Sequence, residues 1–520
     1  MAASAAPPAP EVSPSDIRRL TGWLVALKLA MHVVAAIITP YEFHRDELLY
    51  FAMGTHLRLF HMDFPPLIAL LSEAMRHTIG VSVFTYRLVP GLFGTALFAL
   101  ALLCVRWLGG GRMAITLTAI AMLSSPLLLR TASLFQPVVL DQLAWTAALY
   151  ALLRLEQTDD LRWWLVLGLC GGLGLLAKFS ITFIGVGVLA GLLLTPHRRA
   201  LRARGPWLAC VVALVVGSPS LIGQVTLGWP IFDQMAQLQR GQLDRVTWSE
   251  YLGTQALFVG PAIVMAAMGA MALIRGTPAR HRVVGIACVA TFLLLGALHG
   301  KPYYVGPVYP VLFAAGAVWI ESLARHRARA IVAWSLGLAS AAFGIAVAPF
   351  GLPILPPAPM ARYAAALGIQ AATQTNRGTQ LTLPQDYADM LGWREKADAV
   401  VRVVDSLTPE ERQQVVVYGA NYGQAGALDL YGRRLGLPPV VSLAGSFYLF
   451  GPGARRGDVV VFLGVRAEDL GRLKCRSLDE VARVANPWGV SEERDVPVLL
   501  CRSPEVTVQE IWRRNRPHWG

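Results

Sequence analysis

Long apolar segments alternate with short polar or basic ones along the first 350 residues. Runs of this length with few charges are typical of membrane-spanning helices. The pattern predicts eleven spans, at residues 20–39, 84–105, 113–129, 137–153, 163–177, 181–195, 206–223, 251–274, 283–298, 304–322 and 330–349. The fifth and sixth spans are short, and they meet at Lys178.

Polar positions cluster after the first span, in residues 40–83. Apolar residues recur at helical spacing across residues 46–60, which predicts an amphipathic helix lying in the membrane interface. Pro65 and Pro66 break this helix, and a second one is expected over residues 67–75. The region after the seventh span, with Trp229 and Phe232, predicts another interfacial segment.

The pattern changes near residue 355, after a proline-rich stretch. A polar helix near residues 393–407 is followed by strands at 414–418, 458–463 and 497–501, with a helix at 425–431 between the first two. Strands that alternate with helices indicate a small α/β domain. The Gly-rich turn at residues 419–426 does not fit a nucleotide-binding pattern, and we interpret it as a structural turn or a loop facing an acceptor.

These elements predict a polytopic α-helical membrane protein with a C-terminal α/β domain. We expect a disordered cytoplasmic tail over residues 1–19 and a transmembrane catalytic domain over 20–350. A linker at 351–360 leads to a soluble extracytoplasmic domain at 361–520. The first apolar run lacks a small-residue cleavage site, so we interpret it as a retained span.

Composition agrees with a membrane protein, because 55% of the 520 residues are hydrophobic and mean hydropathy is +0.49. The net charge of +13 lies mostly in residues 1–354, which hold 26 Lys and Arg against 15 Asp and Glu. With a cytoplasmic N-terminus, sixteen basic residues fall on the inner side of the spans and eight on the outer side before residue 355. No basic stripe with interleaved aromatics indicates nucleic-acid binding.

The six cysteines do not form a disulfide framework. Four lie in apolar spans, where small core residues are the simplest interpretation. Cys475 and Cys501 lie in the C-terminal part and are able to pair if that part is extracytoplasmic, so their state stays open.

The predicted topology gathers the unusual polar residues on the outer side. Asp46 and Glu47 suit either helix capping, with Arg45 as an ion-pair partner, or general-base chemistry. Asp63 suits an N-cap before the second helix. Asp141 interrupts an apolar span, where a carboxylate requires a partner or a wet cavity, and this favours function.

The outer basic and aromatic residues also leave alternatives open. Lys178 and Lys301 are placed either to snorkel or to bind a phosphate. Tyr303 and Tyr304 suit an interfacial belt equally well. A divalent metal held by Asp63 with several histidines is a further possibility, although their spacing matches no metal motif; the histidines are His44, His56, His61 and His299.

The ordered motifs identify a resemblance to a known family. They are Arg45-Asp-Glu-Leu-Leu-Tyr50, Asp63-Phe-Pro-Pro-Leu67, Asp141-Gln-Leu, Ala177-Lys-Phe-Ser180, Gly300-Lys-Pro-Tyr-Tyr-Val-Gly-Pro307, residues 384–393 and residues 419–426. In this order they resemble bacterial glycosyltransferase family 39, a GT-C fold group related to protein O-mannosyltransferases and the lipid A aminoarabinose transferase. One position departs from the pattern, because Phe64 stands where relatives carry Lys or His.

The resemblance implies a glycosyltransferase of the bacterial inner membrane that uses a polyprenyl-phosphate sugar donor. Transfer would occur on the extracytoplasmic face to a lipid, polysaccharide or protein acceptor. Asp46 would be the general base and Asp141 a second active-site carboxylate, with Glu47 a further catalytic candidate. The carrier phosphate or the substrate would be bound by Arg45, Asp63, Lys178, Lys301, Tyr303 and Tyr304. A transporter or lipid flippase is the alternative, and a non-catalytic sensor is a third interpretation.

Overall fold

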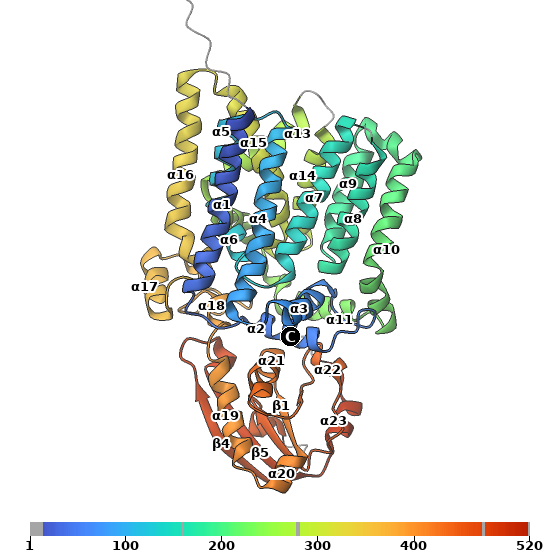
Figure 1. The fold of residues 1–520 in the computed structure, drawn as a ribbon, viewed down its shortest axis with the longest axis vertical. Coiled ribbons are helices and arrows are strands. Elements are labelled where there is room, and N and C mark those ends of the chain that lie inside the picture. Colours follow the sequence, from blue (N-terminus) through green and yellow to red (C-terminus); the bar gives the residue numbers. More distant parts are fainter. Residues whose placement is uncertain (1–13, 159, 277–280, 471–473, 518–520) are drawn as a thin grey trace, which may run out of the picture.

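The computed structural model describes residues 14–158, 160–276, 281–470 and 474–517. A bundle of long helices forms one end of the molecule, and a mixed sheet with its own helices forms the other (Figure 1). Short helices of the first polar loop lie between them, at the end of the bundle that faces the sheet (Figure 1). The predicted architecture, a polytopic helical membrane protein followed by a small α/β region, is confirmed.

The bundle contains every segment that was predicted as a span. Its helices are α1 (Pro14–Ile38), α4 (Val83–Trp107), α5 (Arg112–Leu123), α6 (Pro126–Thr131), α7 (Pro137–Thr158), α8 (Leu161–Ala177), α9 (Ile181–Leu193), α10 (Arg204–Thr226), α12 (Trp248–Val259), α13 (Ile263–Arg275), α14 (Arg282–Ala297), α15 (Tyr309–Leu323) and α16 (Arg327–Gly351). Helices suit a membrane because all their backbone hydrogen bonds are made within the segment.

The predicted number of eleven spans is not confirmed. Among the described residues, seven helical segments are long and apolar enough to cross a membrane, or eight if α9 and the 3₁₀ turn at Pro196–Arg202 count as one bent span. Helices α5, α8 and α14 are apolar but shorter. The third predicted span breaks at Ser125, which caps α6, because Pro126 has no N–H to continue α5.

Small residues let the bundle helices approach closely. Helices α13 and α15 cross where Gly269 faces Gly316, and a Cβ on either glycine would collide with the backbone of the other helix. The core that this packing creates contains Trp145 of α7 and Phe313 of α15, which are both fully buried. This tight packing holds the ends of α7, α8 and α15 in fixed relative positions.

The C-terminal sheet has five strands in the order β2-β1-β3-β5-β4. Their bounds are β1 (Val415–Gly419), β2 (Val440–Val441), β3 (Val459–Leu463), β4 (Cys475–Ala485) and β5 (Asp495–Pro504). Strands β2, β1 and β3 are parallel, whereas β5 and β4 run antiparallel to their neighbours. A disulfide joins Cys475 to Cys501 across β4 and β5.

Alternating side chains give this sheet two apolar faces. Val415 and Val417 of β1 pack beneath α19 (Trp393–Asp405). Val416 points to the opposite face, which is covered by α23 (Val508–Arg514). Shorter helices complete this region, namely α20 (Pro409–Gln414), α21 (Tyr422–Ala427), a π-helical turn (Leu428–Gly432) and α22 (Phe447–Phe450).

The junction between bundle and sheet is more tightly built than a linker. Helix α17 (Pro357–Leu367) starts inside the expected linker, and α18 (Gln385–Ala388) follows it. Their residues Met360 and Tyr387 are fully buried in a cluster with Tyr41 from the first outer loop. At the other end of the chain, residues 14–19 of the expected tail belong to α1, and the expectation for residues 1–13 lies outside the described residues.

Candidate active site

The first outer loop folds into α2 (Arg45–Thr55) and α3 (Leu67–Thr78). A capping box starts α2, because the backbone N–H of Asp46 donates to His44 Nδ1 at 3.1 Å and that of His44 donates to Glu47 Oε2 at 2.7 Å. The predicted interfacial helix is therefore present, although it ends at Thr55 and not at residue 60. The cap fixes the backbone from which Asp46 projects.

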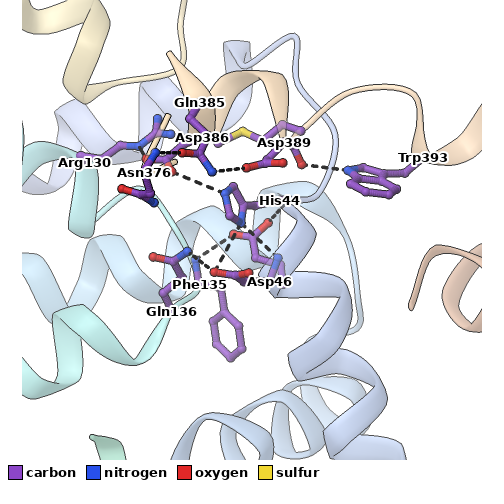
Figure 2. A network of polar contacts seen from close by, with 12 residues as sticks. His44, Asp46, Arg130, Phe135, Gln136, Asn376, Gln385, Asp386, Asp389 and Trp393 are labelled. Atoms are coloured by element: carbon purple, nitrogen blue, oxygen red, sulfur yellow. Dashed lines mark hydrogen bonds and ion pairs between the residues drawn. The ribbon is translucent and has the colours of Figure 1, made fainter. Parts of the chain in front are cut away.

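Asp46 is held by two donors that come from distant parts of the chain. The Tyr422 hydroxyl of α21 donates to Oδ1 at 3.0 Å, and Gln136 Nε2 donates to Oδ2 at 2.9 Å. Figure 2 shows the Gln136 side chain directed at the carboxylate. The Asp46 side chain remains 30% exposed. It is thus an oriented carboxylate that a substrate can still reach, as a general base must be.

Glu47 differs sharply from its neighbour because it is fully buried. It forms an ion pair with Arg87 of α4 and accepts the backbone N–H of Phe135 at 2.8 Å. With the His44 N–H included, protein donors surround both of its oxygens. A buried, fully paired carboxylate favours a structural role in joining α2 to α4 and α7 over contact with a substrate.

Asp141 and Lys178 meet where α7, α8 and α9 come together. Asp141 Oδ2 accepts the Ser180 hydroxyl at 2.6 Å, and Oδ1 accepts the Trp145 indole N–H at 2.9 Å. Lys178 follows α8, and burial lowers its pKa whereas the charge of Asp141 opposes that change. The carboxylate that interrupts α7 therefore has both hydrogen-bond donors and a nearby cation.

Two tyrosines cover this lysine. Lys178 Nζ lies 4.2 Å from the Tyr304 ring centroid and 5.1 Å from that of Tyr303. Both tyrosines come from the 3₁₀ turn that leads into α15. Aromatic faces stabilise a cation without neutralising it, so Lys178 keeps its charge available.

Lys301 lies in the same electrostatic environment. Burial and repulsion from Lys178 lower the pKa of Lys301 to about 8, and attraction to Asp46 opposes that shift. The structure thus brings Asp46, Lys178, Lys301 and the two tyrosines to one place from three separate segments. Two cations that repel each other are an arrangement that a bound anion would stabilise.

Arg45 and Asp63 face the C-terminal region instead. The Arg45 guanidinium lies 4.5 Å above the Tyr422 ring and 3.3 Å from Glu492. Both Asp63 oxygens accept the Ser446 hydroxyl at 2.9 Å, and burial raises the pKa of Asp63 to about 6. Their predicted contact with the carrier phosphate is untested, and their contacts here join the first outer loop to the sheet region.

Several junction residues were not found by sequence reasoning. Glu42 Oε2 accepts the backbone N–H groups of Trp393 and Arg394 at 3.0 and 3.2 Å, and so caps α19. Arg130 Nε donates to Asp386 at 2.8 Å, and Figure 2 shows this pair beside His44. The sequence shows that Glu42 is a carboxylate in a polar loop. It does not show that Glu42 caps a helix whose first residue, Trp393, lies 351 positions later.

The histidines that were considered for a metal site lie apart. The His56 ring stacks on Phe450, His61 contacts Thr226, and His299 contacts the Val246 carbonyl. His44 caps α2. Within the described ranges no three His, Cys, Asp or Glu side chains are grouped so that they would hold a metal ion.

Known proteins resemble this chain in sequence and in fold. Residues 63–222 match the model of the dolichyl-phosphate-mannose-protein mannosyltransferase family. The chain is 28% identical over 390 residues to the lipid A galacturonosyltransferase RgtD of Rhizobium johnstonii, an alignment that covers 68% of this chain and 79% of the relative. The fold resembles ArnT of Cupriavidus metallidurans, both in the apo state (TM-score 0.62, 17% identity) and bound to undecaprenyl phosphate (TM-score 0.60, 16% identity).

These matches support a GT-C membrane glycosyltransferase similar to family 39. Each ArnT structure aligns with 92% of this chain and 98% of its own, so the likeness includes the C-terminal region. The family-model match contains Asp63, Asp141 and Lys178, whereas Asp46 lies before it and Lys301 after it. The predicted family and the predicted multi-pass membrane class of this glycosyltransferase are confirmed.

Proposed function

We propose that this glycosyltransferase moves a sugar from a polyprenyl-phosphate carrier to an acceptor, with Asp46 as the general base and inversion at the sugar. The observation that carries the proposal is the geometry around Asp46. An oriented, accessible carboxylate lies in the same electrostatic environment as two lysines, Lys178 and Lys301, that repel each other. A similar fold is known with undecaprenyl phosphate bound, which supports such a donor.

The lysines act on the leaving group. As the bond between the sugar C1 and the phosphate oxygen breaks, negative charge grows on the carrier phosphate. Lys178 and Lys301 stabilise this charge, and the fixed tyrosines beside Lys178 exclude water and strengthen the attraction. The bound phosphate in turn relieves the repulsion between the two lysines.

Asp46 acts on the acceptor. Its carboxylate takes the proton of the acceptor hydroxyl or amine while the acceptor atom attacks C1 from the side opposite the phosphate. The products are the inverted glycoside, the free polyprenyl phosphate and a protonated Asp46. Asp141 attracts Lys178 and so helps to position it, and Tyr303 and Tyr304 flank the phosphate.

We infer that the site lies on the extracytoplasmic face of a bacterial inner membrane, with the N-terminus in the cytoplasm. The disulfide between Cys475 and Cys501 supports this orientation because such bonds persist in oxidising compartments. The ends of the helices farthest from the sheet carry the arginine-rich segments, as cytoplasmic ends do (Figure 1). The galacturonosyltransferase relative makes lipid A the first acceptor to test.

The experiment is a transfer assay with the purified full chain in detergent. Polyprenyl-phosphate-linked galacturonic acid and aminoarabinose, each with labelled sugar, are incubated with lipid A, and free polyprenyl phosphate is measured with the labelled product. Release of polyprenyl phosphate together with labelled lipid A supports the proposal. In liposomes, movement of the intact labelled donor across the bilayer without its cleavage would replace the transferase with the flippase alternative.

A further inference from the structure

A second concave site lies at the far end of α2 from Asp46. It is a cavity of about 250 Å³ between the first outer loop and the C-terminal region, lined by Phe51, Thr55, Arg76, Val81, Leu430, Arg433 and Arg434. The α2 residues of the lining, Phe51 and Thr55, follow Asp46 by five and nine positions, which places them about 8 and 13 Å along the helix from the Asp46 backbone, and Asp46 itself is not in the lining. The cavity is therefore separate from the site that holds Lys178 and Lys301.

The lining of this cavity is cationic. It includes three guanidinium groups and, among the described residues, no carboxylate. Glu73 pairs with Arg76, and Asp429 pairs with Arg433, but both acids lie outside the lining. A guanidinium has five N–H donors, so each of these pairs orients an arginine and leaves further donors for a ligand.

The third arginine has a different support. Arg434 Nη2 donates to the Val81 carbonyl at 3.3 Å, which joins the C-terminal region to the loop before α4. No described carboxylate pairs with Arg434. The cavity has three guanidinium groups and two carboxylates that pair with them, so one positive charge is uncompensated. The parallel N–H donors of a guanidinium match the spacing of two phosphate oxygens.

The remaining lining is apolar. Phe51, Val81 and Leu430 form part of the wall. Ile79 lies two positions before Val81, Leu435 directly follows Arg434, and both side chains are 53% exposed. The lining residues come from α2, α3 and the segment after α21, and these elements lie where the bundle meets the C-terminal region (Figure 1). A cationic centre with apolar surroundings at a membrane boundary suits a ligand that carries both a phosphate and acyl chains.

We propose that this cavity binds the phosphate group of a membrane lipid headgroup. The three arginines contact the phosphate oxygens, and Ile79 and Leu435 contact the first part of the acyl chains. Since the lining comes from α2, α3, the loop at Val81 and residues 430–434, a bound lipid bridges the first outer loop and the C-terminal region. This binding is independent of sugar transfer and of the identity of the donor.

Native mass spectrometry of the detergent-purified full chain tests the proposal with equimolar dioleoyl phosphatidic acid and dioleoyl phosphatidylcholine. The two lipids share their acyl chains, and only phosphatidic acid has an unblocked phosphate. We expect phosphatidic acid to be retained preferentially, and the Arg76→Gln, Arg433→Gln, Arg434→Gln triple variant to weaken that retention about tenfold or more. A control triple variant removes three exposed arginines outside the lining, Arg402, Arg466 and Arg476, and should retain phosphatidic acid as the wild type does.

The single variant Arg434→Gln separates a loss of lipid binding from a loss of folding, because it breaks no ion pair. We expect it to weaken phosphatidic acid retention while its thermal unfolding matches that of the Arg402→Gln control. Equal retention by Arg434→Gln, the triple variant and the wild type would overturn the proposal. Displacement of phosphatidic acid by an equal concentration of inorganic phosphate would also overturn it, by showing that the acyl chains do not contribute.

Discussion

Tyr422→Phe tests whether the C-terminal region positions the base of the active site. The substitution removes one hydroxyl and leaves the ring beneath the Arg45 guanidinium. Asp46 then keeps the Gln136 donor but loses the donor to its other oxygen, so its carboxylate is freer to rotate away from the acceptor. We expect slower transfer with an unchanged donor KM, because Tyr422 contacts Asp46 and not the lysines that bind the carrier phosphate.

The size of the effect follows from the hydrogen bond that is lost. A hydrogen bond to a charged group contributes about 1.5–3 kcal/mol. The Asp46 side chain is 30% exposed, so water replaces part of the lost interaction and the lower value applies. A cost of about 1.5 kcal/mol corresponds to a decrease of roughly tenfold in kcat.

The assay measures release of polyprenyl phosphate across a pH series. Loss of the orienting donor should lower kcat at every pH of the series. Tyr448→Phe is the matched control, since its hydroxyl donates only to the Asn515 carbonyl in the same region. If Tyr422→Phe and Tyr448→Phe gave the same kcat and the same pH profile, the positioning role would be refuted while the transfer reaction itself stood.

Three further predictions concern the cations and the buried acid. Lys178→Ala should raise the donor KM about tenfold or more with folding intact, because it removes one charge-assisted contact to the phosphate; an unchanged donor KM would limit Lys178 to snorkelling. The pKa of Lys301 is about 8, so the donor KM should rise above pH 8, and Lys301→Arg should abolish that rise because arginine stays charged. The pKa of Asp63 is raised by burial to about 6, so its ionised form lowers stability by about 3 kcal/mol at neutral pH relative to an acid that titrates normally. This cost is absent below the unfolded pKa and grows as the pH rises to 6. Asp63→Asn should therefore unfold at a higher temperature than the wild type at pH 7.5, and the difference should disappear near pH 4. A lower unfolding temperature of Asp63→Asn at pH 7.5 would contradict this prediction.

Much of the fold could be predicted because it depends on local apolar patterning. Each predicted span falls on a helix, and β1, β3 and β5 lie within two or three residues of their predicted positions, since valine-rich runs buried on both faces are easily recognised. Strand β4 was missed because most of its side chains are exposed and its sequence does not alternate clearly. The number of spans was harder to predict, because helices such as α5 and α9 are short and their ends depend on their neighbours.

The candidate site was predictable only in part, for a physical reason. The acids and lysines are unusual in an apolar chain, so Asp46, Asp141, Lys178 and Lys301 could be selected from the sequence. Their partners are set by tertiary packing, and the Tyr422 hydroxyl that contacts Asp46 lies 376 positions away in sequence. The same limit explains why composition left capping and catalysis equally open for Asp46 and Glu47, although Asp46 is accessible and Glu47 is buried against Arg87.

The most direct test of the central claim compares Asp46→Asn with the wild type in single-turnover release of polyprenyl phosphate. The account predicts that Asp46→Asn binds the donor with normal affinity, unfolds at the wild-type temperature and transfers the sugar at least about a hundredfold more slowly, because the asparagine cannot take the acceptor proton. Transfer at the wild-type rate by a folded Asp46→Asn protein would contradict the assignment of Asp46 as the base.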